Sequence, residues 1–154
     1  MFRGVFEHAL DGKGRVSVPS RFREELTQSG QQEVVLTRGL NRCLVVYPMS
    51  RWSAFEERIL ARSQFDLNVI RVKRLFVAGA MECGLDGQGR ILVPPSLREY
   101  AQLDKDVMWV GQLDTVELWS ATLWKQAYEE AVHKSSDALT FDDDFVNALA
   151  QLGL

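Results

Sequence analysis

The sequence has little cysteine and little histidine. Its two cysteines, Cys43 and Cys83, stand 40 positions apart, outside any CxxC motif and away from a histidine cluster. This spacing gives a metal site or a redox pair little support and favours reduced, buried thiols of a cytosolic protein. His8 and His133 stand alone, and no Ser–His–Asp or Cys–His arrangement is recognisable. We therefore predict no catalytic residues, no metal site and no enzyme activity.

Long apolar runs and nucleotide-binding motifs are also missing. No stretch approaches the ~18 apolar residues of a membrane span, and the N-terminus lacks the apolar core of a signal peptide. The glycine pairs are not followed by the third glycine of GxGxxG, and there is no GxxxxGK. We expect a cytoplasmic protein with no cofactor, no membrane partner and no small-molecule substrate.

What the sequence does have is an ordinary globular composition with unevenly placed charge. Its 154 residues include 18 Lys and Arg against 21 Asp and Glu, and 46% are hydrophobic. Residues 1–75 carry a net charge of +5, whereas residues 76–154 carry −8. A basic half suits nucleic acid, and an acidic half suits the basic half of another copy. The alternative is that the basic and acidic halves form surfaces that contact only solvent.

The sequence also repeats itself. Residues 4–24 align with residues 79–99 at an offset of 75, with 11 identities in 21 positions. The identical pairs are Gly4/Gly79, Glu7/Glu82, Leu10/Leu85, Asp11/Asp86, Gly12/Gly87, Gly14/Gly89, Arg15/Arg90, Val18/Val93, Pro19/Pro94, Arg23/Arg98 and Glu24/Glu99. A weaker match relates residues 47–52 to 119–124. Two units are too few for a solenoid, so we predict duplicated modules packed about a pseudo-two-fold axis.

Each module has the same predicted order of elements. An alternating strand, a glycine-framed loop and a second strand ended by proline form a β-hairpin, followed by a short helix, two strands and an amphipathic helix. The predicted strands lie at 4–11, 15–19, 33–37, 43–47, 79–86, 90–94, 107–110 and 116–119, and helices at 21–28, 67–77 and 97–102. The closing amphipathic helices are recognised by apolar stripes, Trp52, Phe55 and Ile59 in the first module and Trp124, Tyr128 and Ala131 in the second. The fold class is therefore α+β.

The domain organisation follows from the repeat. We predict a first module at 4–50, a helical connection at 51–78, a second module at 79–122 and a C-terminal helix and tail at 123–154. After Lys134 the pattern weakens, and the aspartates at 142–144 are suited to cap a terminal apolar helix.

The loop of the first hairpin carries the candidate chemistry. In Asp11-Gly-Lys-Gly-Arg15 the two charged residues flank a three-residue loop, and Gly14 can supply the positive φ of a G1 bulge. In a purely structural interpretation, Asp11 bonds the loop amides and pairs with Arg15 without touching a ligand.

Duplication of this loop favours a nucleic-acid interpretation. A protruding hairpin fits a DNA groove, where Lys13 would neutralise phosphate and Arg15, oriented by Asp11, would meet phosphate or a guanine edge. Gln88 replaces the lysine in the second copy, so that loop tip is neutral and either binds more weakly or serves assembly.

Four segments together resemble the MraZ family of bacterial transcriptional regulators. They are the opening Met-Phe-Arg-Gly, the run LDGKGRVSVPSRFR at 10–23, the Tyr-Pro-x-x-x-Trp segment at 47–52 and the run LDGQGRILVP at 85–94. The most specific element is the pair of Asp-x-x-x-Arg motifs, in two copies of the module shared with AbrB and SpoVT regulators.

The resemblance implies a fold and a function. It implies a swapped-hairpin β-barrel with flanking helices and a ring-like homo-oligomer. It also implies nucleoid-associated binding to short direct DNA repeats that represses the division and cell-wall gene cluster, including the protein's own gene. The implied DNA-binding residues are Arg15, Lys13, Arg3, Arg90 and Gln88. The hairpin-structuring residues are Asp11, Gly12, Gly14, Asp86, Gly87 and Gly89.

Two alternatives stay open at this point. One is an oligomeric scaffold protein whose Asp–Arg turns are structural, which predicts that Arg15→Ala destabilises the fold and that no operator is bound. The other is an enzyme on the same barrel, which predicts a pocket that gathers His8, Cys83 or paired carboxylates. For the ring itself we hypothesise that the basic module of one subunit contacts the acidic module of the next.

Overall fold

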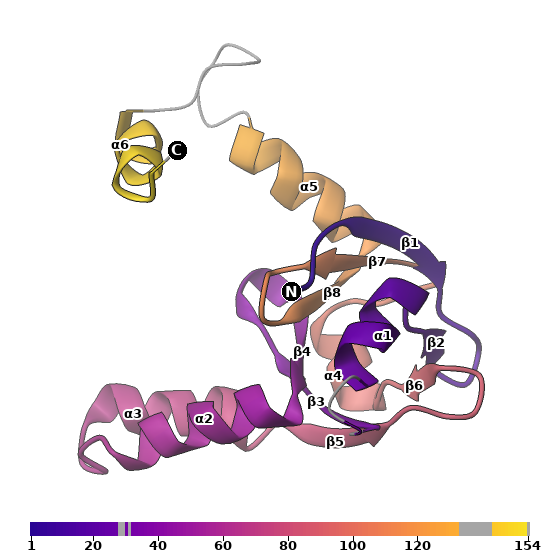
Figure 1. Ribbon diagram of the computed structural model, residues 1–154, viewed down its shortest axis with the longest axis horizontal. Coiled ribbons are helices and arrows are strands. Elements are labelled where there is room, and N and C mark those ends of the chain that lie inside the picture. Colours follow the sequence, from indigo (N-terminus) through magenta and orange to yellow (C-terminus); the bar gives the residue numbers. More distant parts are fainter. Residues whose placement is uncertain (28–29, 31, 133–142, 154) are drawn as a thin grey trace. The chain divides into compact units, whose positions relative to one another are not determined.

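The computed structural model describes residues 1–27, 30, 32–132 and 143–153 (Figure 1). Its contacts divide the chain into two compact units, Met1–Ala121 and Thr122–Leu154. The first unit contains all the strands among these residues, and the second contains nearly all of α5 (Ala121–Val132) together with α6 (Asp143–Gln151). The predicted boundaries at 4–50, 51–78, 79–122 and 123–154 stay a prediction.

The strands of the first unit form two antiparallel sheets. They are β1 (Val5–Ala9), β2 (Arg15–Ser17), β3 (Glu33–Arg38), β4 (Leu44–Pro48), β5 (Met81–Gly84), β6 (Arg90–Leu92), β7 (Asp106–Gly111) and β8 (Val116–Ser120). Six of them form one sheet in the order β1-β7-β8-β4-β3-β5, while β2 pairs with β6. Together with the helices, these sheets confirm the α+β class.

The strand order is symmetric between the two modules. The repeat makes β1 equivalent to β5, β3 to β7 and β4 to β8. Exchanging these equivalent strands gives the same order read from the other end of the sheet, since β1 pairs with β7 and β5 pairs with β3. The modules are therefore interlocked. Pairings among the described residues leave β1 and β5 at opposite ends of the sheet, so a closed barrel stays a prediction.

Pairing within each predicted hairpin is confined to the residues next to its loop, and the strands beyond it pair elsewhere. Around the first loop, one bridge joins Leu10 to Val16, and beyond it β1 pairs with β7 while β2 pairs with β6. The physical reason is burial: pairing β2 with β6 places Val16 beside Ile91, and both are 1% exposed in the shared core. A local hairpin alone would leave that apolar face without a partner.

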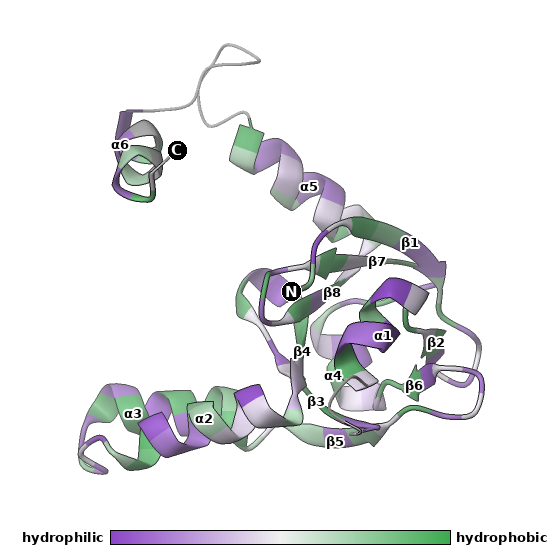
Figure 2. Cartoon of the chain, in the orientation of Figure 1, coloured by the Kyte–Doolittle hydropathy of each residue, from purple (hydrophilic) through white to green (hydrophobic). Residues whose placement is uncertain are grey.

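Short helices cover the ends of these small strands. Pro19 and Pro94 end the strand segments, and α1 (Ser20–Thr27) and α4 (Pro95–Tyr100) start directly after them, as a fixed φ near the first helical turn favours. Both helices bury apolar side chains in the core, which both modules build. Figure 2 shows hydrophobic residues on strands of both modules, among them β4 and β7. The largest fully buried side chains include Phe22, Leu36, Leu44, Ile91, Leu97, Trp109 and Leu118.

A helical segment connects the modules. It consists of α2 (Met49–Leu60), α3 (Leu67–Val72) and a π-helical turn (Lys73–Val77), whereas a short 3-10 turn (Leu40–Arg42) lies earlier, between β3 and β4. The predicted stripe on α2 is buried at Trp52 only. Asp66 caps α3 by accepting from two backbone N–H groups.

The second unit contains two amphipathic helices. On α5, the predicted stripe places Trp124 beside Tyr128, with ring centroids 6.0 Å apart. The helix α6 begins at Asp143 and carries Asp144 in its first turn, as an acidic N-terminus favours. The tail between Lys134 and α6, like His133, lies outside the described residues. No described helix is long and apolar enough to cross a membrane.

Candidate nucleic-acid interface

The first turn, residues 11–15, is closed by one carboxylate. Asp11 Oδ1 accepts from the backbone N–H groups of Lys13 and Arg15, both at 2.9 Å, and Oδ2 accepts from Arg15 Nε at 2.7 Å. The Asp11 N–H donates to the Arg15 carbonyl at 2.9 Å. Gly14 has a φ of 85°, a conformation that glycine adopts without strain. The Asp11 carboxylate therefore holds Arg15 both by its backbone N–H and by its side-chain Nε.

The second turn, residues 86–90, is a geometric copy. Asp86 Oδ1 accepts from the N–H groups of Gln88 and Arg90 at 2.9 Å, and Oδ2 accepts from Arg90 Nε at 2.8 Å. Gly89 has a φ of 71°. Gly12 and Gly87 differ from these glycines, because neither has a positive φ and an added Cβ would meet nothing within 4 Å.

These hydrogen bonds lower the pKa of both aspartates. The pKa of Asp11 falls from 3.8 to about 2, above all because the Arg15 N–H bonds the charged form, with the Arg15 side chain and the Lys13 N–H adding to it. The pKa of Asp86 is lowered chiefly by the Arg90 N–H. Both carboxylates are therefore charged at neutral pH and keep their arginines in place.

The two motif arginines lie on one face of the β2–β6 pair. In the register, Arg15 is opposite Leu92 and Ser17 is opposite Arg90, so these residues share a face while Val16 and Ile91 point to the core. Arg15 and Arg90 are thus diagonal neighbours, roughly 7–8 Å apart between Cα atoms. The strand exchange brings arginines from both modules to one surface.

The motif side chains remain available to a ligand. The Arg15 side chain is 35% exposed and that of Arg90 26%. Within the described residues, each of these side chains donates hydrogen bonds from Nε alone. Their terminal nitrogens therefore face no competing protein acceptor there. Lys13 and Gln88 are exposed at the two loop tips. Such paired donors suit phosphate oxygens or the O6/N7 edge of guanine.

Arg3 is not brought to this surface. It precedes β1, next to the β7–β8 turn, where the Phe2 N–H donates to the Leu113 carbonyl at 2.7 Å. The first turn follows the opposite end of β1, and an extended strand of this length separates Arg3 from Asp11 by roughly 25 Å. That Arg3 contacts DNA stays a prediction, and such a contact would lie away from the two turns.

Sequence reasoning did not predict that two arginines, Arg23 and Arg98, touch the turns. A Cβ added at Gly14 would lie 2.8 Å from Arg98 Cζ, and a Cβ at Gly89 would overlap Arg23. Arg98 belongs to α4 and Arg23 to α1, so each contacts the turn of the other module. The repeat contained a signal, because Arg23 and Arg98 are themselves an identical pair.

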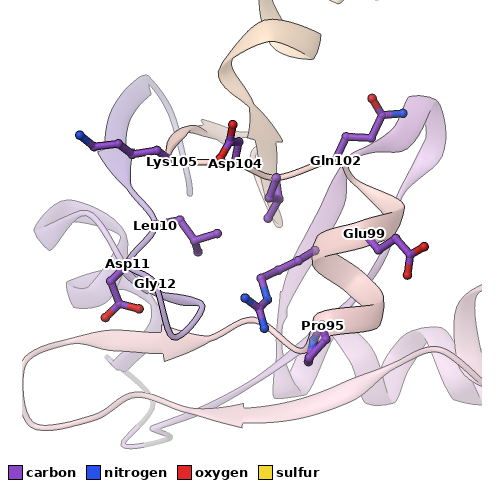
Figure 3. A pocket seen from close by; sticks show the side chains of 10 residues that line it. Leu10, Asp11, Gly12, Pro95, Glu99, Gln102, Asp104 and Lys105 are labelled. Atoms are coloured by element: carbon purple, nitrogen blue, oxygen red, sulfur yellow. The ribbon is translucent and has the colours of Figure 1, made fainter.

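A hollow of about 930 Å³ adjoins the first turn (Figure 3). Asp11 and Gly12 line one side, and Arg98 and Glu99 of α4 line the other. The carboxylates there include Asp11, which is already bonded to Arg15. Its lining also includes Glu99 and Asp104 but neither His8 nor Cys83, so carboxylates are the only groups named by the enzyme interpretation that line it.

The two cysteines are buried free thiols, as predicted. Burial raises the pKa of Cys43 to about 12, with Glu117 adding to the effect, and burial also raises the pKa of Cys83. Among the described residues, no group of three His, Cys, Asp or Glu side chains is arranged to hold a metal ion.

These features define a class: a duplicated α+β protein whose interlocked modules present two carboxylate-braced arginine turns. The sequence matches the family described as "MraZ protein, putative antitoxin-like" over residues 1–74 and 76–144. The chain belongs to this family, which confirms the resemblance found in the motifs.

Relatives from several bacteria agree with this assignment, and each is named "Transcriptional regulator MraZ". The relative from Thioalkalivibrio sulfidiphilus is 46% identical over 130 residues, covering 84% of this chain and 87% of its own. That from Carboxydothermus hydrogenoformans is 45% identical over 146 residues, covering 90% and 99%. That from Desulfitobacterium hafniense is 47% identical over 131 residues, covering 85% and 89%. Their shared name describes a regulatory function rather than an enzymatic one.

Proposed function

We propose that this protein is a DNA-binding transcription regulator that contacts DNA through the β2–β6 face. The observation that carries the proposal is the placement of Arg15 and Arg90 on one surface, each oriented by its own aspartate. An arginine held through Nε keeps its planar terminal nitrogens in a fixed direction, which lowers the ordering cost of a bidentate contact.

The two turns contribute unequally to DNA binding. Lys13 adds a positive charge at the tip of the first turn, whereas Gln88 is neutral at the tip of the second. Phosphate neutralisation dominates DNA affinity, so the first turn supplies more of the binding free energy. Arg90 and Gln88 extend the contact along the groove. The net charge of −3 is no objection, because only the local field at this face must be positive.

The proposed target follows the family resemblance. The protein binds short direct repeats upstream of the division and cell-wall gene cluster, represses that cluster together with its own gene, and works in the cytoplasm at the nucleoid. The interlocked sheet closes into a swapped-hairpin barrel, and several copies form a ring. Few phosphates meet each face, so useful affinity needs several faces on several repeats at once.

The uneven charge along the chain is the basis for the proposed contact between neighbouring copies in the ring. The first 75 residues carry +5 and the remainder −8, so a head-to-tail contact joins opposite charges and closes into a ring. At ~1 M salt the Debye length is about 3 Å, which screens such a contact. Light scattering in low and high salt measures the assembled mass. A mass unchanged at ~1 M salt shows that charge does not hold the copies together.

A binding titration tests the DNA proposal. The purified protein is titrated onto the DNA upstream of its own gene, beside Arg15→Ala, Arg90→Ala and Arg71→Ala, an equal loss of charge on an exposed part of α3. We expect Arg15→Ala to weaken binding about tenfold or more, Arg90→Ala to weaken it less, and Arg71→Ala to leave it nearly unchanged. Thermal melts verify that each variant is folded.

The same titration separates the scaffold alternative. Wild-type binding should fall steeply with salt, and loss of one phosphate contact should reduce the slope of log K against log salt by about 1. A folded wild type that binds none of this DNA, or an Arg15→Ala variant that binds equally well, would refute the proposal. A marked loss of stability in Arg15→Ala without DNA binding by the wild type indicates purely structural turns.

A further inference from the structure

Arg98 occupies the space that a side chain at position 14 would need. Three of its guanidinium atoms, Cζ, Nε and Nη1, lie 2.8–3.0 Å from the Cβ position of Gly14. The planar group therefore covers the α-carbon of the first turn directly. Figure 3 shows Asp11 and Gly12 of the first turn across a hollow from Pro95 and Glu99 of α4, two segments far apart in the sequence.

The second turn has the same contact with the modules exchanged. A Cβ at Gly89 would overlap the guanidinium of Arg23, which also donates from Nη1 to the Gln88 carbonyl at 3.4 Å. Arg23 and Arg98 occupy equivalent positions of the repeat. The arrangement is thus built twice, and in both places the arginine belongs to the other module.

Backbone hydrogen bonds cross between the modules at the same two glycines. The Val93 N–H donates to the Gly14 carbonyl at 2.8 Å, and the Val18 N–H donates to the Gly89 carbonyl at 2.9 Å. Each glycine is therefore fixed on its carbonyl by one residue and on its α-carbon by an arginine, both from the opposite module. Rotation of the turn about its glycine would disturb both contacts.

Arg98 keeps a buried donor at this contact, its Nε, which has no hydrogen-bond partner among the described residues. Buried donors without a partner are uncommon and disfavoured, so a position that keeps one calls for a compensating role. Contact with Gly14 supplies that role, because the planar guanidinium restricts a glycine, whose backbone is otherwise the freest of any residue type.

We propose that Arg98 and Arg23 are positioning residues, each of which holds the DNA-facing turn of the opposite module. This inference rests on the proposed function for its effect on DNA, but its structural part stands on the contacts alone. Arg98 fixes the turn that presents Lys13 and Arg15, and Arg23 fixes the turn that presents Arg90. A preorganised turn loses less conformational entropy on binding.

Residue-specific amide exchange by NMR tests the crossed arrangement. In Arg98→Ala we expect the amides of the first turn to exchange about tenfold faster and those of the second turn to stay unchanged. Arg23→Ala should give the opposite pattern. Lys105→Ala removes a charge from the same hollow without contacting Gly14, so it should change neither turn.

Arg98→Lys supports the interpretation of these variants. It keeps the positive charge and most of the apolar stem but lacks the planar plate, so the first turn should loosen nearly as much as in Arg98→Ala. If Arg98→Ala does not fold, the lysine variant carries the comparison. Unchanged exchange at the first turn in a folded variant, or faster exchange at the second turn instead, would overturn the inference.

DNA titration then distinguishes positioning from direct contact. Arg98→Ala should weaken operator binding about fivefold with an unchanged salt slope, because no phosphate contact is lost. A slope reduced by about 1, as expected for Lys13→Ala, would show that Arg98 binds phosphate itself and would overturn its positioning role. If the wild type binds no DNA, the proposed function fails, while the exchange pattern still decides whether the arginines hold the turns.

Discussion

Trp109 donates from its indole Nε1 to the backbone carbonyl of Ser17 at 3.0 Å. Trp109 is a fully buried residue of β7, in the second module, whereas Ser17 ends β2, the strand that begins with Arg15. The bond therefore attaches the arginine-bearing strand of one module to the sheet strand of the other. The position of the proposed DNA face depends on both halves of the chain.

Replacing this tryptophan should destabilise the fold. Trp109→Phe keeps an aromatic ring but removes the donor, which leaves the Ser17 carbonyl unpaired in the core and a gap where the larger ring was. We expect a loss of about 1–3 kcal/mol in the free energy of unfolding, measured by urea titration. Trp52→Phe is the control, because its Nε1 donates to the exposed carboxylate of Glu56, which water can solvate instead. Equal losses in the two variants would contradict this account.

Much of the fold could be predicted from the sequence. Period-two alternation located the strands, because that signal depends on neighbouring residues. The repeat, found by aligning the sequence with itself, predicted two equivalent modules. Strand pairing across modules could not be predicted in the same way. The segment that forms β2 has a suitable partner in β1 by proximity and in β6 by burial, and only the packed core, with Val16 beside Ile91, decides between them.

In the candidate site, too, local contacts could be predicted from the sequence and contacts between the modules could not. The bonds that Asp11 makes to its own loop are local, so the turn could be predicted from five consecutive residues. The contact of Arg98 with Gly14 depends on how α4 lies against the opposite module, and no spacing rule contains that information. The position of Arg3 away from the first turn, by contrast, follows from the extended strand β1, which lies between Arg3 and Asp11 and was predicted from local alternation.

The two glycines of the first turn should respond differently to substitution. Gly14→Ala places a Cβ on a residue with a φ of 85° and into the Arg98 guanidinium, whereas Gly12→Ala meets open space. We expect Gly14→Ala to lower the free energy of unfolding by about 1–3 kcal/mol and Gly12→Ala to change it by less than about 0.5 kcal/mol. Chemical denaturation measures both. Similar losses would show that neither the φ nor the guanidinium contact matters.

A double-mutant cycle measures the contact across the modules. Removing the guanidinium clears the space above position 14, so Gly14→Ala should be less damaging when Arg98→Ala is already present. We expect a coupling of about 0.5–2 kcal/mol from urea unfolding of the four proteins. The matched cycle of Gly14→Ala with Arg23→Ala should be additive within about 0.5 kcal/mol, because Arg23 contacts the other turn. Additivity in both cycles would contradict the crossed contacts.

Acid should weaken the first turn over a defined pH range. The pKa of Asp11 is about 2 in the folded protein against 3.8 without these contacts, so its carboxylate favours the folded turn above pH 3.8, and this contribution is lost as the pH falls towards 2. A ¹³C NMR titration of the carboxyl carbon should give a midpoint near 2. In Arg15→Ala the midpoint should rise only part of the way to 3.8, because the backbone N–H groups of Lys13 and residue 15 still bond the carboxylate. A wild-type midpoint near 3.8 would show that the carboxylate does not brace the turn in solution.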